Sequence, residues 1–459
     1  MSFGKGKSRS SALLLFILFA MLLAGCGAGP AGSNTDSQPS PAGTDAGTAE
    51  GDGAKDPKQI SATIKVWDWD EAFHETMIPE FNKLYPNIKV EYTVVSNTDY
   101  LQKLQSGIVS GSDIPDVIMG EVGYRGKLFD LDILDDLEGA PYNFQREQML
   151  DYVVPLMTNS EDKLVGIEQQ IAVAGLAYRR DLAKEYLGTD NPDEIEGMIK
   201  DWDAFTAKGI EIKEKSGGKV LMLPGLLDAY FVLNGQRGME YIKGEDIDLT
   251  GKMKPTLDRL FDMRDKGIIG KLENGSPSWA ASFASGDYLF YPSATWSPKW
   301  QVAANDKDGS GRWGLVAAPE GSFTLGGTSV SVYKDSKVKE AAWAYMNFCY
   351  LSDEGTKIAA EKFGFLPGVK SFYENNRELI DKGSEFDAFF GGQNLSKYFV
   401  EKVVPGVSGQ PQTKYEAIVT QAFKTLYPLW TKDASIDANT AMSKYIDEVK
   451  SKARDANVK

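Results

Sequence analysis

The sequence predicts an α/β fold whose first part contains a parallel β-sheet. Short apolar segments at residues 63–67, 88–95 and 116–119 have the length and composition of strands, and two segments with helical periodicity separate them. The order β-α-β-α-β is typical of parallel strands joined by right-handed crossovers. The chain has 459 residues, and the roughly 400 residues after position 59 exceed what a single core usually organises. We therefore expect two domains.

The two intervening helices are predicted from apolar spacing and from residues that begin or end helices. Residues 75–84 place four apolar side chains on one helical face, namely Met77, Ile78, Phe81 and Leu84, and Pro86 then ends the helix. The second helix is predicted to begin at Asp99, as its N-terminal cap, and to end at Gly111. The later chain is predicted to be more helical, with further strands at 172–178, 315–318 and 329–333.

Aromatic and acidic residues follow the first and third strands. Trp67, Asp68 and Trp69 end the first strand, and Glu121 and Tyr124 follow the third. In parallel α/β sheets, ligands bind beyond the C-terminal ends of the strands. Strand alternation predicts that the two tryptophans lie on one side of the sheet and Asp68 on the other. We expect at least one tryptophan to face a ligand; the alternative is that both pack in the core.

The N-terminus has the pattern of an export signal. Lys5, Lys7 and Arg9 precede an apolar run at residues 12–23, which is short for a spanning helix. The run ends in Leu23-Ala24-Gly25-Cys26, which resembles the lipobox of bacterial lipoproteins. The resemblance implies cleavage before Cys26 and acylation of this residue, which would anchor the protein stably to a membrane. The alternative is an ordinary secreted protein with an incidental cysteine.

The segment between Cys26 and the globular part is predicted to be a disordered linker. Residues 27–58 are rich in Gly, Ala, Ser, Thr, Pro and Asp and contain no aromatic or large aliphatic residue until the strand region begins. Such a segment cannot bury enough apolar surface to offset the entropy of ordering. The predicted organisation is therefore a signal peptide at 1–25, a lipidated cysteine and linker at 26–59, and the globular part after it.

Charge and residue usage exclude several classes of function. Loss of the three basic residues of the leader lowers the net charge from −15 to −18, so we expect no nucleic-acid partner. His74 is the only histidine, and Cys349 is the only cysteine after position 26, so we expect no metal centre and no internal disulfide. Cys349 lies in an apolar segment that reads as a buried helix. No phosphate-binding GxxxxGK[ST] loop occurs. We expect no cofactor and no catalytic residues.

Several segments resemble a known family in the order in which they occur. They are 81–90 (FNKLYPNIKV), 114–117 (IPDV), 176–182 (LAYRRDL), 201–205 (DWDAF), 283–286 (FASG) leading to Trp296, and 334–343 (KDSKVKEAAW). Together they are similar to the bacterial extracellular solute-binding proteins of family 1, which are carbohydrate receptors of ABC importers. The resemblance covers nearly all of residues 60–459.

The resemblance implies a two-lobed, periplasmic-binding-protein-like (type II) α/β fold with a hinge and an interlobe cleft. Lobe one would comprise residues 60–171 and 319–366, and lobe two residues 172–318 and 367–459. A ligand that contacts both lobes only in the closed arrangement would bias the hinge toward closure. The implied partners are a carbohydrate ligand and the permease subunits of an ABC transporter, and the implied state is a monomer.

Candidate ligand-binding residues follow from the chemistry of sugars. A sugar ring needs flat aromatic surfaces for its C–H faces and carboxylate or amide groups for its hydroxyls. The strand ends, the expected hinge and one Gly/Leu-rich stretch supply Trp67, Asp68, Trp69, Glu121, Tyr124, Gln169, Gln170, Asp228 and Tyr230. The resemblance adds Trp296, at a position that commonly stacks on sugar, and Gly327, where the chain returns to the first lobe. For each residue the alternative is a structural or solvated position.

Two classes of function remain open at this point. The first is a lipid-anchored receptor on the extracellular face of the bacterial cell membrane that captures a sugar or oligosaccharide for an ABC importer. The second is a lipid-anchored glycoside hydrolase, which would need two carboxylates roughly 5–10 Å apart across a sugar. Within the receptor class, the ligand could instead be a peptide, a polyamine or an anion, and the sequence does not specify a particular sugar.

Overall fold

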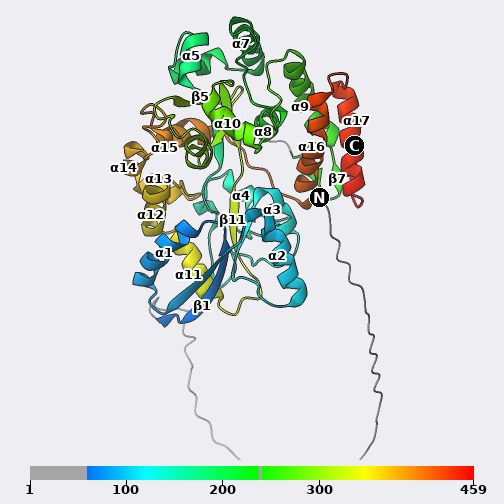
Figure 1. Cartoon of the computed structure of the whole chain (residues 1–459). Helices are drawn as coiled ribbons and strands as arrows, with labels where there is room; N and C mark the ends of the chain where they lie inside the picture. The colour runs from blue at the N-terminus through cyan, green and yellow to red at the C-terminus, as the bar shows by residue number, and fades with distance from the viewer. Residues whose placement is uncertain (1–58, 237–239) are drawn as a thin grey trace, which may run out of the picture. The chain divides into compact units, whose positions relative to one another are not determined.

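Two β-sheets organise the part of the chain described by the computed structural model, which comprises residues 59–236 and 240–459. The first sheet, whose strands β1 and β11 are labelled in Figure 1, has the strand order β2-β1-β3-β11-β4. Its strands are β1 (Ala62–Asp68), β2 (Ile88–Val94), β3 (Val117–Glu121), β4 (Ile167–Glu168) and β11 (Thr328–Val332). As predicted, β1 runs parallel to both β2 and β3, whereas β11 is antiparallel to β3.

The helices between these strands begin earlier than the sequence predicted. α1 spans Glu71–Leu84, because Asp70 caps it by accepting a hydrogen bond from the backbone N–H of Phe73. α2 spans Asn97–Ser110, and its cap is Ser96 rather than Asp99. Gly111 ends α2 with φ of 66°, as a glycine cap should. The apolar spacing located both helices, but short polar residues upstream set their starts.

The second sheet contains β10 (Phe323–Thr324), β5 (Val173–Arg179) and β8 (Phe290–Ala294), with β9 (Trp313–Val316) paired to β5. All seven residues of β5 are buried, since neighbouring strands and helices cover both faces. A small third sheet has the order β12-β7-β6, formed by Asn457–Val458, Asp246–Ile247 and Ile242–Lys243. The helices around these sheets are α5 (Arg180–Tyr186), α6 (Pro192–Met198), α7 (Trp202–Lys215), α8 (Leu226–Gln236), α9 (Leu249–Asp265) and α10 (Pro277–Ser285).

The remaining helices complete both halves of the described chain. α3 (Val122–Phe129) follows β3, and α4 (Val153–Leu156) precedes β4. After β11 the chain forms α11 (Lys339–Tyr350), α12 (Asp353–Phe363), α13 (Lys370–Asn375), α14 (Arg377–Lys382), α15 (Leu395–Tyr398), α16 (Lys414–Lys432) and α17 (Ala438–Lys452). Helix α16 packs against α3 and against α17 and α8, so it contacts elements of both halves.

Three connections between the two sheet regions lie side by side. The chain leaves the first sheet after β4, returns after β10, and leaves again after α12. The Ile171 N–H donates to the Leu366 carbonyl at 2.8 Å, and the Leu325 N–H donates to the Ala172 carbonyl at 2.8 Å. The three connecting segments are therefore hydrogen-bonded to one another. The second crossing follows Thr324, because β10 still belongs to the second sheet.

Two hydrophobic clusters accompany the two sheets. One includes Ile64, Phe81 and Met119 of the first sheet region, and the other includes Leu176, Phe205 and Phe290 of the second. Cys349 is buried within α11, as the sequence indicated. Among the described residues, no helix is both long and apolar enough to cross a membrane. The predicted signal peptide, Cys26 and most of the linker lie outside the described residues.

Candidate functional site

A cavity of about 800 Å³ opens beside the second crossing of the chain. Its lining comes from both sheet regions: the start of α3 at residues 121–123, helices α8 and α10, the segment that follows β8, and residues 324–326 at the crossing itself. Helix α16 and the residues before it complete the wall. Its size lies within the range of small-molecule binding sites. The location fits a ligand that contacts both halves of the described chain.

Asp228 on α8 is the most constrained polar group of this lining. Its side chain is fully buried, and Oδ1 accepts hydrogen bonds from Trp279 Nε1 at 3.0 Å and from Asn274 Nδ2 at 2.8 Å. The second carboxylate oxygen, Oδ2, has no side-chain partner. Burial raises the pKa of Asp228 to about 7. A buried acceptor without a partner is costly, so the position suits a ligand hydroxyl or amine that donates to Oδ2.

Aromatic rings form a second feature of the cavity. Trp296 is half-buried and donates its indole N–H to the Leu325 carbonyl at 3.0 Å, which ties the ring to the crossing segment. A Cβ on Gly326 would lie 3.2 Å from Trp296 Nε1, so the glycine permits this close approach. Tyr230 also lines the cavity, and its ring stacks on Phe423 with centroids 3.7 Å apart. Such rings can cover the apolar face of a ligand.

Glu121 connects the cavity to the first sheet. It is the last residue of β3 and the N-cap of α3, where Oε2 accepts the Gly123 N–H at 2.7 Å. Burial raises the pKa of Glu121, while the Gly123 hydrogen bond acts in the opposite direction. The side chain is thus held at the rim of the cavity by the helix start.

The charges of the lining nearly cancel, although the whole chain is strongly acidic. Five acidic residues line the cavity, Glu121, Asp162, Asp228, Glu240 and Glu416, against four basic residues, Arg146, Lys243, Lys252 and Lys424. The net charge of the full chain is −15. A balanced lining favours a neutral ligand over a strongly charged one. Within the described part of the chain, no cluster of His, Cys, Asp or Glu could hold a metal ion.

The residues expected at the end of β1 do not line the cavity. Trp67 is 2% exposed, and Trp69 is partly buried; both contact Tyr100 of α2 edge to face. Asp68 lies on the opposite side, buried, where Oδ2 contacts His74 Nε2 at 2.9 Å. The predicted alternation is therefore present, but α2 covers one face and α1 with α11 the other. Both tryptophans belong to or pack against the core, which was the alternative left open by the sequence.

The other predicted residues divide between the cavity and the hinge region. Glu121, Asp228, Tyr230 and Trp296 line the cavity. Tyr124 is buried and is not part of the cavity lining, and its hydroxyl donates to the Met119 carbonyl at 3.3 Å.

Gln169, Gln170 and Gly327 lie at the crossings rather than in the cavity lining. The Gln169 N–H donates to the Thr328 carbonyl at 2.9 Å, which joins the first crossing to β11. The Gln170 side-chain oxygen is buried without a hydrogen bond. Gly327 has φ of 109°, and its carbonyl accepts the Val122 N–H at 2.9 Å. These three residues are placed to act on the hinge, and a role in ligand contact stays a prediction.

Sequence reasoning missed the residues that complete the Asp228 environment. Trp279 and Asn274 approach Asp228 from positions 51 and 46 residues away in the chain. Residues 412–424, at the start and along one face of α16, also line the cavity. No local motif marks these contacts, because they depend on how α10 and α16 pack against α8. The only available signal was Ser276-Pro277, which marks the start of the helix that carries Trp279.

The chain matches a family model described as bacterial extracellular solute-binding protein over residues 76–385. The match covers more than half of the sequence. The chain belongs to this family of bacterial extracellular solute-binding proteins. The family resemblance predicted from the sequence is thereby confirmed, and the family is one of binding proteins that act outside the cytoplasm.

Individual members of the solute-binding family match most of this chain. The lactose-binding protein of Rhizobium radiobacter is 25% identical over 394 residues, which cover 80% of this chain and 89% of the relative. The arabinooligosaccharide-binding protein of Bacillus subtilis (strain 168) is 24% identical over 363 residues, covering 74% of this chain and 80% of the relative.

Solved structures share the fold of this solute-binding protein. A crystal structure of an extracellular solute-binding protein of family 1 has a TM-score of 0.76 at 20% identity and covers 85% of this chain and 100% of its own. The galacto-N-biose/lacto-N-biose I-binding protein of Bifidobacterium longum, solved with lacto-N-biose, has a TM-score of 0.68 at 19% identity and covers 87% and 99%. The two-lobed α/β fold predicted for this chain is confirmed.

Proposed function

We propose that this protein captures a neutral sugar or oligosaccharide in the cavity and delivers it to an ABC importer. Support comes from the two relatives, whose described ligands are lactose and arabinooligosaccharides, and from the solved structures with bound sugars. The observation that carries the proposal is Asp228, a buried carboxylate whose Oδ2 has no hydrogen-bond partner, in the lining of a cavity that Trp296 also lines. A hydroxyl can donate to the carboxylate while a ring face lies against the indole.

The proposal includes closure of two lobes around the ligand. Lobe one would comprise residues 60–171 and 325–366, and lobe two residues 172–324 and 367–459, because β10 belongs to the second sheet. The three hydrogen-bonded crossings would act as the hinge. A saturating sugar should reduce the radius of gyration measured by X-ray scattering. A tightly bound sugar that leaves the scattering curve unchanged would contradict hinge closure.

The proposal also includes attachment to the outer face of the membrane through Cys26. The lipobox Leu23-Ala24-Gly25-Cys26 supports it. Cys26→Ser should transfer the protein from the detergent phase to the aqueous phase in a partition assay on expressing cells. Equal partition of the variant and the parent protein would contradict the proposed lipid anchor and would leave the proposal of sugar binding unaffected. Cys349→Ser is the matched control, because this thiol is buried in α11.

A thermal-shift panel tests the central proposal. Lactose, lacto-N-biose, β-1,6-galactobiose, maltose and arabinooligosaccharides should be compared with a polyamine, a dipeptide and citrate. A ligand that binds only the folded state raises the melting temperature by mass action. A shift with a sugar supports the proposal, and a shift only with the amine, peptide or anion assigns another solute. Recovery of the bound sugar intact separates a receptor from a glycoside hydrolase.

A further inference from the structure

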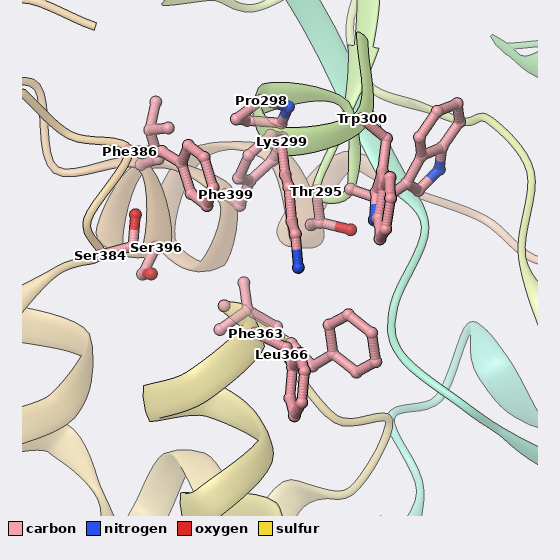
Figure 2. Close-up of a pocket in the computed structure, with 14 residues that line it drawn as sticks. Thr295, Pro298, Lys299, Trp300, Phe363, Leu366, Ser384, Phe386, Ser396 and Phe399 are labelled. Atoms are coloured by element: carbon pink, nitrogen blue, oxygen red, sulfur yellow. The ribbon is translucent and has the colours of Figure 1, made fainter. Parts of the chain in front are cut away.

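Lys299, in the segment that follows β8, reaches an aromatic ring on the other side of the crossings. Its ammonium lies 4.7 Å from the centroid of the Trp300 ring and 5.3 Å from the centroid of the Phe363 ring. Trp300 belongs to the same segment, Pro298–Ala303, whereas Phe363 is the last residue of α12. Figure 2 shows the Lys299 side chain extended from this segment towards Phe363 and Leu366. With the proposed boundaries, a cation of lobe two therefore lies against an aromatic ring of lobe one.

Phe363 is held by an aromatic cluster of the first sheet region. Its ring centroid lies 5.5 Å from that of Phe73 and 5.6 Å from that of Phe365. Phe73 is a fully buried residue of α1 and stacks on Tyr350 of α11. The ring that Lys299 contacts is thus fixed to the core of lobe one, so it would not follow Lys299 if the lobes separated.

The segment that carries Lys299 is tied to the hinge at its other end. Thr295, four residues earlier, donates its hydroxyl to the carbonyl of Ile171 in the first crossing. Between this segment and the end of α12, a space of only about 20 Å³ remains, which is room for little more than a water molecule. The lysine side chain itself occupies the groove, so a change in the angle between the lobes would change its contact with Phe363.

Lys299 lies toward the edge of the first sheet that also contributes to the cavity. Asp70 follows β1, and it is near enough for the charge of Lys299 to act on it: burial raises the pKa of Asp70, and Lys299 is among the groups that oppose this rise. Glu121 ends β3 and lines the cavity. Because β1 and β3 are parallel, their carboxyl ends meet at one edge. Closure of the lobes over the cavity should therefore bring Lys299 and Phe363 together, and opening should part them.

We propose that Lys299 is a positioning residue for ligand capture, whose ammonium clasps the Phe363 ring and holds the lobes near their closed arrangement before a sugar binds. The inference rests on the proposed hinge closure. Lys299 is half-buried, and among the described residues no carboxylate lies within 4 Å of its ammonium, so no salt bridge competes with the rings. A partly desolvated cation–π contact can shift such an equilibrium about threefold to tenfold. Sugar affinity changes with the population of the closed arrangement.

X-ray scattering in the absence of sugar tests the clasp without reference to any ligand. Lys299→Met removes the charge at similar side-chain length, Lys299→Arg keeps a cation that stacks on aromatic rings, and Lys307→Met at an exposed position is the control. Lys299→Met should have a larger radius of gyration than the parent protein, whereas Lys299→Arg and Lys307→Met should match the parent. An unchanged radius in a Lys299→Met protein with the melting temperature of the parent would overturn the inference.

A double-mutant cycle tests whether Lys299 acts through Phe363. Calorimetric titration should use the sugar that raises the melting temperature most in the thermal-shift panel. Lys299→Met and Phe363→Leu should each weaken binding about threefold to tenfold, and the double variant should lose no more than either single variant, because both remove one contact. Additive losses would show that the two residues act independently, which would overturn the clasp.

Scattering at saturating sugar separates a shifted equilibrium from a distorted fold. The bound sugar should restore the radius of gyration of Lys299→Met to that of the saturated parent, and a radius that stays larger would overturn the inference. If no sugar of the panel binds the parent, the proposed function is refuted, and scattering without sugar still decides whether the clasp exists.

Discussion

Trp279 donates its indole N–H to Oδ1 of Asp228 at 3.0 Å, across 51 residues of sequence. The hydrogen bond fixes Oδ1, whereas Oδ2 is buried without a hydrogen-bond partner among the described residues. Oδ1 is thus held by the fold, and Oδ2 is the oxygen to which we propose that a ligand hydroxyl donates. Burial raises the pKa of this carboxyl group to about 7, so its charge is sensitive to pH near neutrality.

Asp228→Asn is expected to raise the melting temperature at pH 8 more than at pH 5. The raised pKa means that the folded state binds this proton more tightly than the unfolded state, whose carboxyl has its ordinary value of 3.8. The stability of the parent protein therefore falls as pH rises from about 4 to about 7, and the full loss persists above pH 7. Asn carries no charge, so the stability of the variant does not fall over this pH range. Asp447→Asn, an exposed position, is the control, and an equal shift at both pH values would contradict the assignment.

Sugar affinity should rise between pH 6 and pH 8, because the ionised Asp228 carboxylate accepts a ligand hydroxyl more strongly than the protonated acid. Calorimetric titration at the two pH values measures the change, and Asp228→Asn should weaken binding and flatten the dependence. Burial also raises the pKa of Glu168 to about 7, but this residue lies beneath the crossings and does not line the cavity. A Glu168→Gln variant should therefore still bind sugar more tightly at pH 8 than at pH 6. If this variant lost the pH dependence of affinity, the dependence would originate at Glu168 beside the crossings and not at Asp228.

Trp296→Ala and Trp67→Ala should have opposite effects. Trp296 lines the cavity, so its truncation should weaken sugar binding about tenfold or more, with a melting temperature near that of the parent. Trp67 is 2% exposed, so its truncation should cost roughly 3–5 kcal/mol of unfolding free energy in urea titrations. Loss of affinity in a stable Trp67→Ala protein would show that the first strand end contacts the ligand after all.

Gly327→Ala should destabilise the protein more than Gly321→Ala. Both glycines have positive φ, 109° and 125°, so both substitutions strain the backbone by roughly 1–3 kcal/mol. A Cβ at Gly327 would in addition lie 2.7 Å from Glu168 Oε1, whereas a Cβ at Gly321 would meet nothing within 4 Å. Urea unfolding of the two variants isolates the steric contribution. Equal destabilisation would mean that the crossing relaxes to admit the methyl group.

His74→Ala should lower stability by about 2–5 kcal/mol without changing sugar affinity. Its ring joins Asp68 Oδ2 at 2.9 Å and the Tyr345 hydroxyl at 2.7 Å, and all three groups are buried. Truncation leaves both partners without their contact. Tyr345→Phe removes only the hydroxyl that contacts the His74 ring, so it should lower the free energy of unfolding by less than His74→Ala does. A His74→Ala protein as stable as the parent in urea would refute this structural role.

Local sequence patterns predicted the first sheet better than the candidate site. The order of β1, β2 and β3 and their parallel pairing follow from short apolar runs separated by helical periodicity, which are local signals. The side of the sheet occupied by Trp67 was also predictable, because strand residues alternate. The sequence did not predict that a helix covers this side, because the cover depends on Tyr100 of α2, which packs against both Trp67 and Trp69.

The same distinction between local sequence signals and long-range packing applies to the residues of the candidate site. Asp228 and Trp296 could be proposed because a carboxylate and an indole suit a sugar, and the family resemblance marked the second position. Trp279, Asn274 and the α16 face could not, because long-range packing alone brings them to Asp228 and the cavity.

The burial of Cys349 makes this chain a convenient scaffold for an optical sensor. The sequence contains two cysteines, and Cys26 is the one expected to carry lipid, so a leaderless protein that begins after it has a single thiol. Burial raises the pKa of the Cys349 thiol far above its usual range, which leaves little reactive thiolate. A cysteine introduced by Ser160→Cys, at the exposed rim of the cavity, would then be the one site that a maleimide dye labels. The dye would report ligand capture without any further removal of native cysteines.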